Sequence, residues 1–255
     1  RKTPSKKLLF NSLTIRKSKT MKTLINSILC LCLFSISAFA EHSNPLSANF
    51  ALSSDYMYRG QSQTGNLPAI SGGLDYEMGP WYAGVWASNV DFGNNVTQEV
   101  DLYTGYTVDM GKVSYDAGLM YYLYPGQPEG SDFNFLEGSV GVEYALSEKI
   151  SAGVTGRYTP DWQGSTGYGV NVEGDVTFVI GSGISLSAVA GKQTVEETNS
   201  WGTPDWTYYQ VGVTKSLGAI DVSASWVDSD LTASECFSGS NICEGRALLS
   251  VSSSW

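Results

Sequence analysis

The chain has 255 residues, of which 42% are hydrophobic and 16% charged, and its formal net charge is −10. Residues 41–255 hold all 25 acidic side chains but only 7 of the 15 basic ones, so this part alone carries a net charge of −18. Nucleic-acid binding needs basic patches, and this charge balance therefore excludes it. An acidic chain of this kind favours cations, or contact with an anionic surface that cations bridge.

Residues 21–40 have the features of a signal peptide. A methionine and a lysine precede an apolar run at 24–39, and the segment ends in Ala-Phe-Ala, the small-x-small pattern that precedes signal-peptidase cleavage. We expect cleavage after Ala40 and a mature chain that begins at Glu41. Residues 1–20 contain seven basic residues and no acid, and we expect them to be an upstream extension or a long n-region.

Two other interpretations of this N-terminal segment are weaker. A retained membrane helix is disfavoured because the apolar run is near the lower length limit for spanning a bilayer, and no stop-transfer pattern follows. A lipoprotein signal is disfavoured because Cys30 and Cys32 each follow leucine rather than a small residue. Export is therefore expected, and residues 41–255 form the expected folded domain.

After residue 40 the recurring pattern alternates polar and apolar residues with a period of two. Leu136, Val140 and Val142 share one parity, for example, and Glu137 and Glu143 share the other. Side chains of a β-strand alternate between the two faces of a sheet, so this pattern predicts strands. Strands of about ten residues suit a tilted crossing of a bilayer. We expect twelve strands, at 49–59, 69–78, 81–90, 97–108, 113–124, 135–144, 150–159, 168–179, 184–193, 206–215, 220–228 and 246–255.

The connections between these segments alternate between short and long. Short turns are expected at 79–80, 109–112, 145–149, 180–183 and 216–219. Generally longer links, rich in Gly, Pro, Asn, Ser and Trp, are expected at 60–68, 91–96, 125–134, 160–167, 194–205 and 229–245. Bacterial outer-membrane barrels have short periplasmic turns and longer extracellular loops. The sequence therefore predicts an all-β, antiparallel, up-and-down transmembrane β-barrel with both termini in the periplasm.

Aromatic residues near the expected strand ends fit the same fold. Residues such as Trp81, Tyr82 and Trp226 lie where the strands would meet the membrane interfaces. The alternating segment 246–255 ends in Trp255, a terminal aromatic that resembles the recognition signal of barrel-assembly machinery. An exported soluble β-sandwich also alternates, but it predicts neither strands this long nor a regular order of short and long loops.

A catalytic site is not expected. Outer-membrane barrel enzymes rely on a histidine base, and residues 41–255 contain only His42, close to the expected mature N-terminus, where no fixed geometry is expected. Acidic pairs such as Asp228 and Asp230 lie at loop edges and are interpreted as solvated charge or as sites for divalent cations. No His/Cys metal cluster, phosphate-binding glycine loop or dinucleotide fingerprint is present. We therefore expect no enzyme activity, no metal and no cofactor.

The cysteines of the expected mature chain are Cys236 and Cys243, which Ser, Gly and Asn residues surround. In an oxidising compartment two cysteines at this spacing are expected to close a small loop. Metal binding is the alternative, but no histidine accompanies them. We expect a disulfide, in a loop on the outside of the cell.

Charged residues on the expected strands share the parity opposite to the apolar face. A charge that faces lipid costs about 2–4 kcal/mol at the bilayer midplane, so we expect these residues to point into the lumen. Rings of carboxylates favour cations, and Arg59 and Arg157, near the expected outer mouth, are candidates for guiding an anionic group past the acidic wall. The alternative is that the charges neutralise one another in a filled lumen. The candidates are Asp55, Arg59, Asp75, Glu99, Asp101, Glu137, Glu143, Arg157, Glu173, Asp175 and Asp221.

A more specific pattern occupies residues 50–106. It comprises SSDYMYRGQSQ at 53–63, PAISGGLDY at 68–76, WYAGVWASNVDF at 81–92 and EVDLYTGY at 99–106. With this pattern the chain resembles the TorF-like family of proteobacterial outer-membrane porins, long grouped as conserved proteins of unknown function. The resemblance extends over nearly all of the expected mature chain and implies an outer-membrane barrel and a channel. It carries over no catalytic residue, and a fold alone does not fix a function.

We therefore expect a porin-like channel in the Gram-negative outer membrane that passes small hydrophilic solutes passively and prefers cations. A structural or receptor-type barrel that does not conduct, and that presents its loops to a surface partner, is the alternative. The expected partners are outer-membrane lipid, lipopolysaccharide, small hydrophilic solutes and, through the strand that ends at Trp255, the barrel-assembly machinery.

Overall fold

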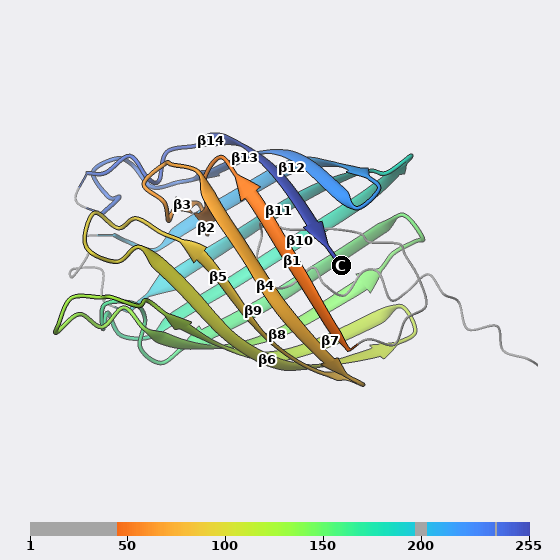
Figure 1. Ribbon diagram of the computed structural model, residues 1–255, viewed down its shortest axis with the longest axis horizontal. Coiled ribbons are helices and arrows are strands. Elements are labelled where there is room, and N and C mark those ends of the chain that lie inside the picture. Colours follow the sequence, from red (N-terminus) through yellow and green to blue (C-terminus); the bar gives the residue numbers. More distant parts are fainter. Residues whose placement is uncertain (1–44, 197–202, 238) are drawn as a thin grey trace, which may run out of the picture.

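A computed structural model describes residues 45–196, 203–237 and 239–255 of the chain. In these residues twelve strands close into an antiparallel barrel, in which each strand pairs with its neighbours and β1 pairs with β14 (Figure 1). The expected leader at 1–40 and His42 lie outside the described residues. The wall consists of β1 (Leu46–Ser53), β4 (Ala69–Met78), β5 (Trp81–Asn89), β6 (Gln98–Met110), β7 (Val113–Leu123), β8 (Phe135–Ala145), β9 (Ile150–Thr159), β10 (Gly169–Gly181), β11 (Ile184–Val195), β12 (Trp206–Leu217), β13 (Ile220–Ser229) and β14 (Arg246–Ser254).

The predicted barrel of twelve strands is confirmed, with one correction to the first strand. The strand expected at 49–59 is wrong in its second half, because β1 ends at Ser53. Arg59 has a φ of 50° and Gly60 a φ of 83°, and these left-handed backbone conformations have no place in a regular strand. Residues 54–68 instead fold into the barrel, and we call them the inner hairpin.

The outer surface of the barrel is apolar, and its inner surface is polar. On β8 the outward Leu136 and Val140 are 45% and 64% exposed, whereas the inward Glu137 and Glu143 are 5% and 6% exposed. Aliphatic side chains are exposed to this extent around the whole wall, and such a surface is suited to contact with lipid. Among the described residues, no helix is long and apolar enough to cross a membrane.

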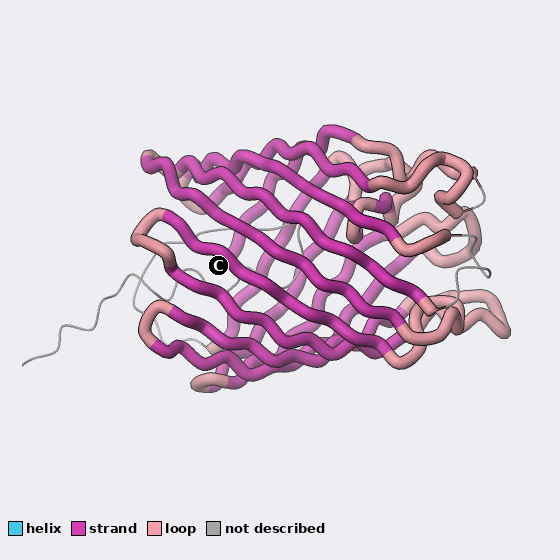
Figure 2. Tube along the Cα trace, turned by 180° about the vertical axis from the view of Figure 1, so that it is seen from behind, coloured by secondary structure: helices cyan, strands magenta, loops and turns pink. Residues whose placement is uncertain are grey.

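The two ends of the barrel differ in the length of their connections (Figure 2). At one end, which we call the short-turn end, lie the turns 79–80, 111–112, 146–149, 182–183 and 218–219. At the other, the long-loop end, lie the connections 54–68, 90–97, 124–134 and 160–168 and the described parts of the connections 196–205 and 230–245. β1 begins and β14 ends at the short-turn end, as an even number of antiparallel strands requires. The alternation of short and long connections predicted from the sequence is confirmed.

A disulfide closes the end of the connection 230–245. The Sγ atoms of Cys236 and Cys243 are 2.04 Å apart, and the predicted disulfide is therefore confirmed. The backbone N–H of Ser62, in the inner hairpin, donates a hydrogen bond of 2.8 Å to the carbonyl oxygen of Ile242. The hydroxyl of Ser229, at the end of β13, donates to the carbonyl oxygen of Cys243. The closed loop is thus attached both to the wall and to the inner hairpin.

Replacing both Cys236 and Cys243 by serine is expected to lower the stability of the refolded protein. The chain-entropy model gives about 2–3 kcal/mol for a disulfide that closes so short a loop. The measurement is thermal unfolding in detergent, with and without dithiothreitol. Reductant should destabilise the wild type and leave the double-serine variant unchanged, and an equal effect on both proteins would contradict the expectation.

Candidate functional site

The inner hairpin turns back on itself inside the barrel through a two-residue turn. Its two short strands are β2 (Met57–Tyr58) and β3 (Gln61–Ser62), and Tyr58 pairs with Gln61. The turn residues between them are Arg59 and Gly60, both with positive φ. This geometry is that of a type I′ turn, which favours Asn-Gly or Gly-Gly. An arginine at the first position costs conformational energy, and such outliers concentrate where a side chain has a function.

The tip of the inner hairpin is pressed against the wall. A Cβ atom added to Gly60 would lie 2.9 Å from Tyr208 Cβ and 3.0 Å from Ser229 Cβ, so a larger residue does not fit there. Trp206 Nε1 donates a hydrogen bond of 2.8 Å to the carbonyl oxygen of Arg59. The turn therefore lies against β12 and β13, and its backbone is fixed by a wall side chain.

The guanidinium of Arg59 joins two separate strands of the wall. Nη2 donates to both carboxylate oxygens of Glu137 on β8, at 2.7 and 2.8 Å, and Nη1 donates to Gln193 Oε1 on β11 at 2.6 Å. Arg59 is 6% exposed and Glu137 5%, so the pair is almost fully removed from water. Burial lowers the pKa of Arg59, but Glu137 and nearby tyrosines raise it, and the net pKa lies well above the usual value. The charge on Arg59 is therefore permanent.

A second cluster of polar side chains lies on β9 and β10, between the strands that carry Glu137 and Gln193. Arg157 on β9 donates to Asn171 Oδ1 at 2.8 Å and to Glu173 Oε1 at 3.2 Å, both on β10. Tyr208 Oη, on β12, donates to Glu173 Oε2 at 2.6 Å. This cluster and the contacts of Arg59 with Glu137 and Gln193 together form a polar network of two neighbouring groups over β8 to β12. We call this level of the barrel the constriction.

Further contacts hold the base of the inner hairpin. The carboxylate of Asp55 accepts hydrogen bonds from Ser62 Oγ at 2.6 Å and Thr64 Oγ1 at 2.8 Å. Its other oxygen lies 2.9 Å from Arg246 Nη1, at the start of β14. Tyr56 Oη donates to Glu99 Oε1 on β6 at 2.8 Å. The hairpin is thus bound at its base to β6 and β14 and at its tip to β8, β11 and β12.

Three tyrosines on the inner wall each lie across a glycine of the next strand and reach a carboxylate on the strand beyond. Tyr208 on β12 reaches Glu173 on β10 in this way, and a Cβ on the intervening Gly191 would lie 2.4 Å from the tyrosine ring. A side chain at the glycine would displace the ring. We call these sets the tyrosine rows. The other two are Tyr103–Gly84–Asp75 and Tyr82–Gly105–Asp116.

The structure brings some of the predicted lumen residues together and leaves others apart. The prediction that Asp55 and Arg59 lie on a strand is wrong, because both belong to the inner hairpin. Ion pairs join Arg59 to Glu137 and Arg157 to Glu173. Whether any of these charges selects ions stays a prediction. The candidates on the inward side of wall strands are Asp75, Glu99, Asp101, Glu137, Glu143, Arg157, Glu173, Asp175 and Asp221.

Several residues of the site were missed by sequence reasoning. Arg246 has the parity opposite to Ala247 and Leu249 on the outer face, so the alternation in β14 could have identified it as inward. Asp116 likewise has the parity of the buried Tyr122 on β7. No comparable signal exists for the uncharged members of the network, because glutamine, asparagine and tyrosine occur on both faces. The missed uncharged residues are Tyr82, Tyr103, Asn171, Gln193, Trp206 and Tyr208.

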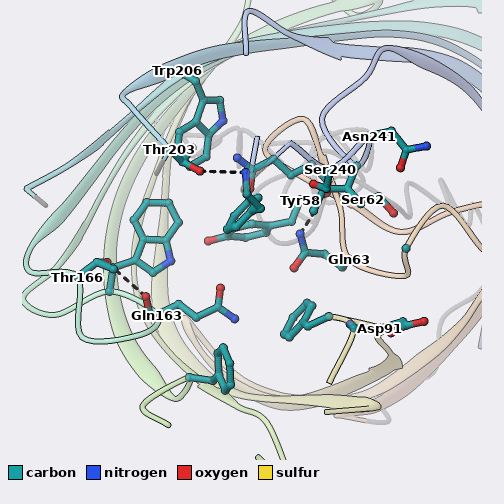
Figure 3. Close-up of a pocket in the computed structure, with 18 of the residues that line it drawn as sticks. Tyr58, Ser62, Gln63, Asp91, Gln163, Thr166, Thr203, Trp206, Ser240 and Asn241 are labelled. Atoms are coloured by element: carbon teal, nitrogen blue, oxygen red, sulfur yellow. Dashed lines mark hydrogen bonds between the residues drawn. The ribbon is translucent and has the colours of Figure 1, made fainter. Parts of the chain in front are cut away.

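A cavity of about 520 Å³ lies between the inner hairpin and the connections of the long-loop end, which together supply most of its lining. The hairpin contributes Tyr58, Ser62 and Gln63 to it, and Trp206 and Thr203 lie on another side of it (Figure 3). We call this space the vestibule cavity. Its remaining described lining residues are Gln61, Gly65, Asp91, Phe92, Gly93, Phe133, Trp162, Gln163, Thr166, Val195, Phe237, Ser240, Asn241 and Ile242.

A resident metal is not indicated by the donor groups. Within the described parts of the chain, no group of three or more His, Cys, Asp and Glu side chains could hold a metal ion. The carboxylates of Glu99, Glu137 and Glu173 accept hydrogen bonds from tyrosines and arginines instead.

Comparison with known families gives one match over most of the chain. The model of a bacterial family, described as proteins of unknown function (Gcw_chp), matches residues 37–253. No curated protein matches the sequence at a significant level. Since the matching family has no porin name, the TorF-like resemblance stays a prediction.

Solved structures with a similar fold are outer-membrane porins and channels. The NanC porin is 12% identical, with a TM-score of 0.55 over 82% of this chain and 98% of that one. The KdgM porin, solved in complex with disordered oligogalacturonate, is 9% identical, with a TM-score of 0.53 over 82% of this chain and 99% of that one. An outer-membrane channel from Pseudomonas putida F1 is 9% identical, with a TM-score of 0.52 over 85% and 99%. At such identities the likeness concerns the fold alone.

Proposed function

Since the chain belongs to the Gcw_chp family of bacterial proteins of unknown function, we propose from its own structure that it is a porin-type channel of the outer membrane. It passes small hydrophilic solutes by passive diffusion and prefers cations. The observation that carries this proposal is a closed barrel with an apolar outside and a charged inside, narrowed by an inserted hairpin. We assign no catalytic role to any residue.

The orientation in the membrane follows from the two ends of the barrel. Outer-membrane barrels place short turns in the periplasm and long loops outside the cell. The short-turn end, with both ends of the described barrel, is then periplasmic, and the vestibule cavity opens to the exterior. Lipid and lipopolysaccharide surround the apolar face, and the strand that leads to Trp255 is the proposed contact with the assembly machinery.

A preference for cations is supported by the distribution of charge along the lumen. The arginines of the lumen, Arg59, Arg157 and Arg246, lie toward the long-loop end, where each contacts a carboxylate. The half nearer the short-turn end carries carboxylates on β4, β7, β8 and β13, and such groups around a lumen attract cations. These carboxylates are Asp75, Asp116, Glu143 and Asp221.

The inner face of β11 to β14 supports a water-accessible path through the barrel. Inward positions of β11 to β14 carry small hydroxyl side chains, such as Ser187, Ser225 and Ser250, which are partly exposed although they face the interior. These small side chains leave open space in the lumen beside β11 to β14, whereas tyrosines fill the corresponding space beside β5 to β7. The narrowest level is then the constriction, and below it the lumen widens.

Planar-bilayer recording of the purified, refolded protein tests this function. We expect discrete single-channel currents and, in a KCl gradient, a reversal potential of the sign that marks cation preference. If no current appears under any ionic condition, the protein is the non-conducting, receptor-type barrel. A reversal potential of the opposite sign would overturn the cation preference while leaving the channel in place.

Neutralising two lumen carboxylates is expected to weaken the cation preference. The variant combines Asp116→Asn with Glu143→Gln, on neighbouring strands and near the short-turn end. Both changes keep side-chain size, so the reversal potential should move toward zero while single-channel conductance stays in the same range. The matched control is Glu129→Gln, an exposed residue of the connection 124–134. A shift of equal size in the control would show that the lumen charges do not set the selectivity.

A further inference from the structure

The vestibule cavity combines aromatic surfaces with uncharged hydrogen-bonding groups. Phe92, Trp162 and Trp206 are among the rings that line it, and Tyr58 contributes a ring from the inner hairpin. The lining also contains side-chain amides and hydroxyls, and each of these groups can both donate and accept hydrogen bonds. The polar lining residues of this kind are Gln61, Ser62, Gln63, Gln163, Thr166, Thr203, Ser240 and Asn241.

Charge is nearly absent from the described part of this lining. Asp91 is the one carboxylate among the described lining residues, and no lysine or arginine is among them. The nearest strong cation of the constriction, Arg59, is engaged by Glu137 on two oxygens. An anionic solute in the vestibule cavity would therefore find a carboxylate and no free basic partner, which disfavours it.

One polar group at the cavity has spare hydrogen-bonding capacity. Gln61 is 4% exposed, and its amide Nε2 is buried without a hydrogen-bond partner. Leaving such a donor unpaired costs about 1–3 kcal/mol, which an acceptor on a bound solute would recover. Gln163, on the facing loop, is only partly buried and also lines the space. Amide groups therefore reach the cavity from the hairpin on one side and from the loop 160–168 on the other.

We propose that the vestibule cavity binds a neutral saccharide, and, resting on the proposed channel function, that this is the site where a sugar is collected before it passes the inner hairpin. Sugar hydroxyls both donate and accept hydrogen bonds and suit amide and hydroxyl partners. The C–H faces of a sugar ring suit aromatic side chains, which bury apolar area at fixed positions. A cavity of about 520 Å³ lies in the range of small-molecule sites, roughly 300–1,000 Å³, and admits a saccharide of one or two rings.

Binding is measured in detergent solution by tryptophan fluorescence, because Trp162 and Trp206 line the cavity. The probes are glucose, maltose, cellobiose and lactose as neutral sugars, and digalacturonate as an anionic sugar of similar size. Saturable fluorescence changes are expected with at least one neutral sugar, and weaker or no binding with digalacturonate. Stronger binding of digalacturonate than of every neutral sugar would overturn the proposal, as would the lack of any saturable response.

Two variants test the site itself. Gln163→Leu removes an amide at nearly constant volume, and Phe92→Ala removes an aromatic surface, and each is expected to weaken binding about tenfold. The matched control is Gln98→Leu, an exposed glutamine on β6 outside the cavity lining, which should bind as the wild type does. Equal affinities in Gln163→Leu, Phe92→Ala and the control would place the sugar elsewhere and overturn the assignment.

The same preparation separates this proposal from the channel function. Fluorescence in detergent requires no ion flow, so sugar binding by a protein that carries no bilayer current would support the site and reject the channel. Bilayer current without saturable sugar binding would support the channel and reject the site. Where both hold, the bound sugar should reduce the ion current at concentrations near its dissociation constant.

Discussion

Replacing Arg59 by methionine is expected to lower the free energy of unfolding by about 3–5 kcal/mol, the cost of breaking a buried ion pair by removing one partner. The carboxylate of Glu137, 5% exposed, loses both of its hydrogen bonds from the guanidinium. Gln193 loses its donor at the same time. Methionine retains much of the side-chain length, so the loss of stability arises more from the missing charge than from changed packing. Urea unfolding in detergent, followed by tryptophan fluorescence, measures it.

The control for this variant removes the second charge as well. The double variant Arg59→Met with Glu137→Gln leaves no buried ion and is expected to recover most of the lost stability. Arg246→Met offers a second comparison. The Arg246 side chain is 18% exposed, and its partner Asp55 keeps the hydrogen bonds from Ser62 and Thr64, so the loss of Arg246 should cost less. If Arg59→Met unfolds at the same urea concentration as the wild type, the ion pair does not hold the hairpin in place.

Removing the end of the inner hairpin is expected to raise single-channel conductance several-fold. In this variant two glycines replace residues 57–62, which comprise β2, β3 and the turn between them. The segment fills the constriction, where Met57, Arg59 and Gly60 are buried inside the barrel, and its loss should widen the narrowest level. Conductance in planar bilayers measures the change, and heat-modifiable migration in gels shows that the barrel still folds.

A second shortened loop provides the matched control. Two glycines in place of residues 126–131 shorten the connection 124–134 by the same amount, but these residues do not enter the constriction. Its conductance should remain close to that of the wild type. If both shortened proteins conduct like the wild type, the inner hairpin does not limit the current, and the narrowest level lies elsewhere in the lumen.

The wall strands could be predicted from the sequence because their physics is local. In a barrel that meets lipid on one side and water on the other, a strand must alternate apolar and polar residues. On β8 this rule alone assigns Leu136 to the outside and Glu137 to the inside, as the structure has them. Turn residues with positive φ, such as Gly79 and Gly218, end the strands at the short-turn end and sharpen the boundaries.

The inner hairpin could not be predicted in the same way, because its conformation depends on partners far along the chain. Residues 54–59 continue the alternation of β1, and a strand through them was the natural interpretation. What turns them inward is contact with Glu137, Gln193 and Trp206, which lie 78, 134 and 147 residues away from Arg59. The sequence predicts that Arg59 lies near the outer mouth. Its ion pair and its contacts with the wall could be identified only from the closed barrel, which brings these distant strands together.

The tyrosine rows constrain how this barrel can change during evolution. Each row joins three strands, and its members can be replaced only in a particular order. At Gly191 even an alanine would meet the ring of Tyr208, so the tyrosine has to become smaller before the glycine can gain a side chain. The carboxylate of Glu173 would then lose one of its donors and keep the hydrogen bond from Arg157. In homologues we therefore expect glycine and tyrosine at these paired positions to be exchanged together, which makes strand pairing in this barrel readable from correlated substitutions.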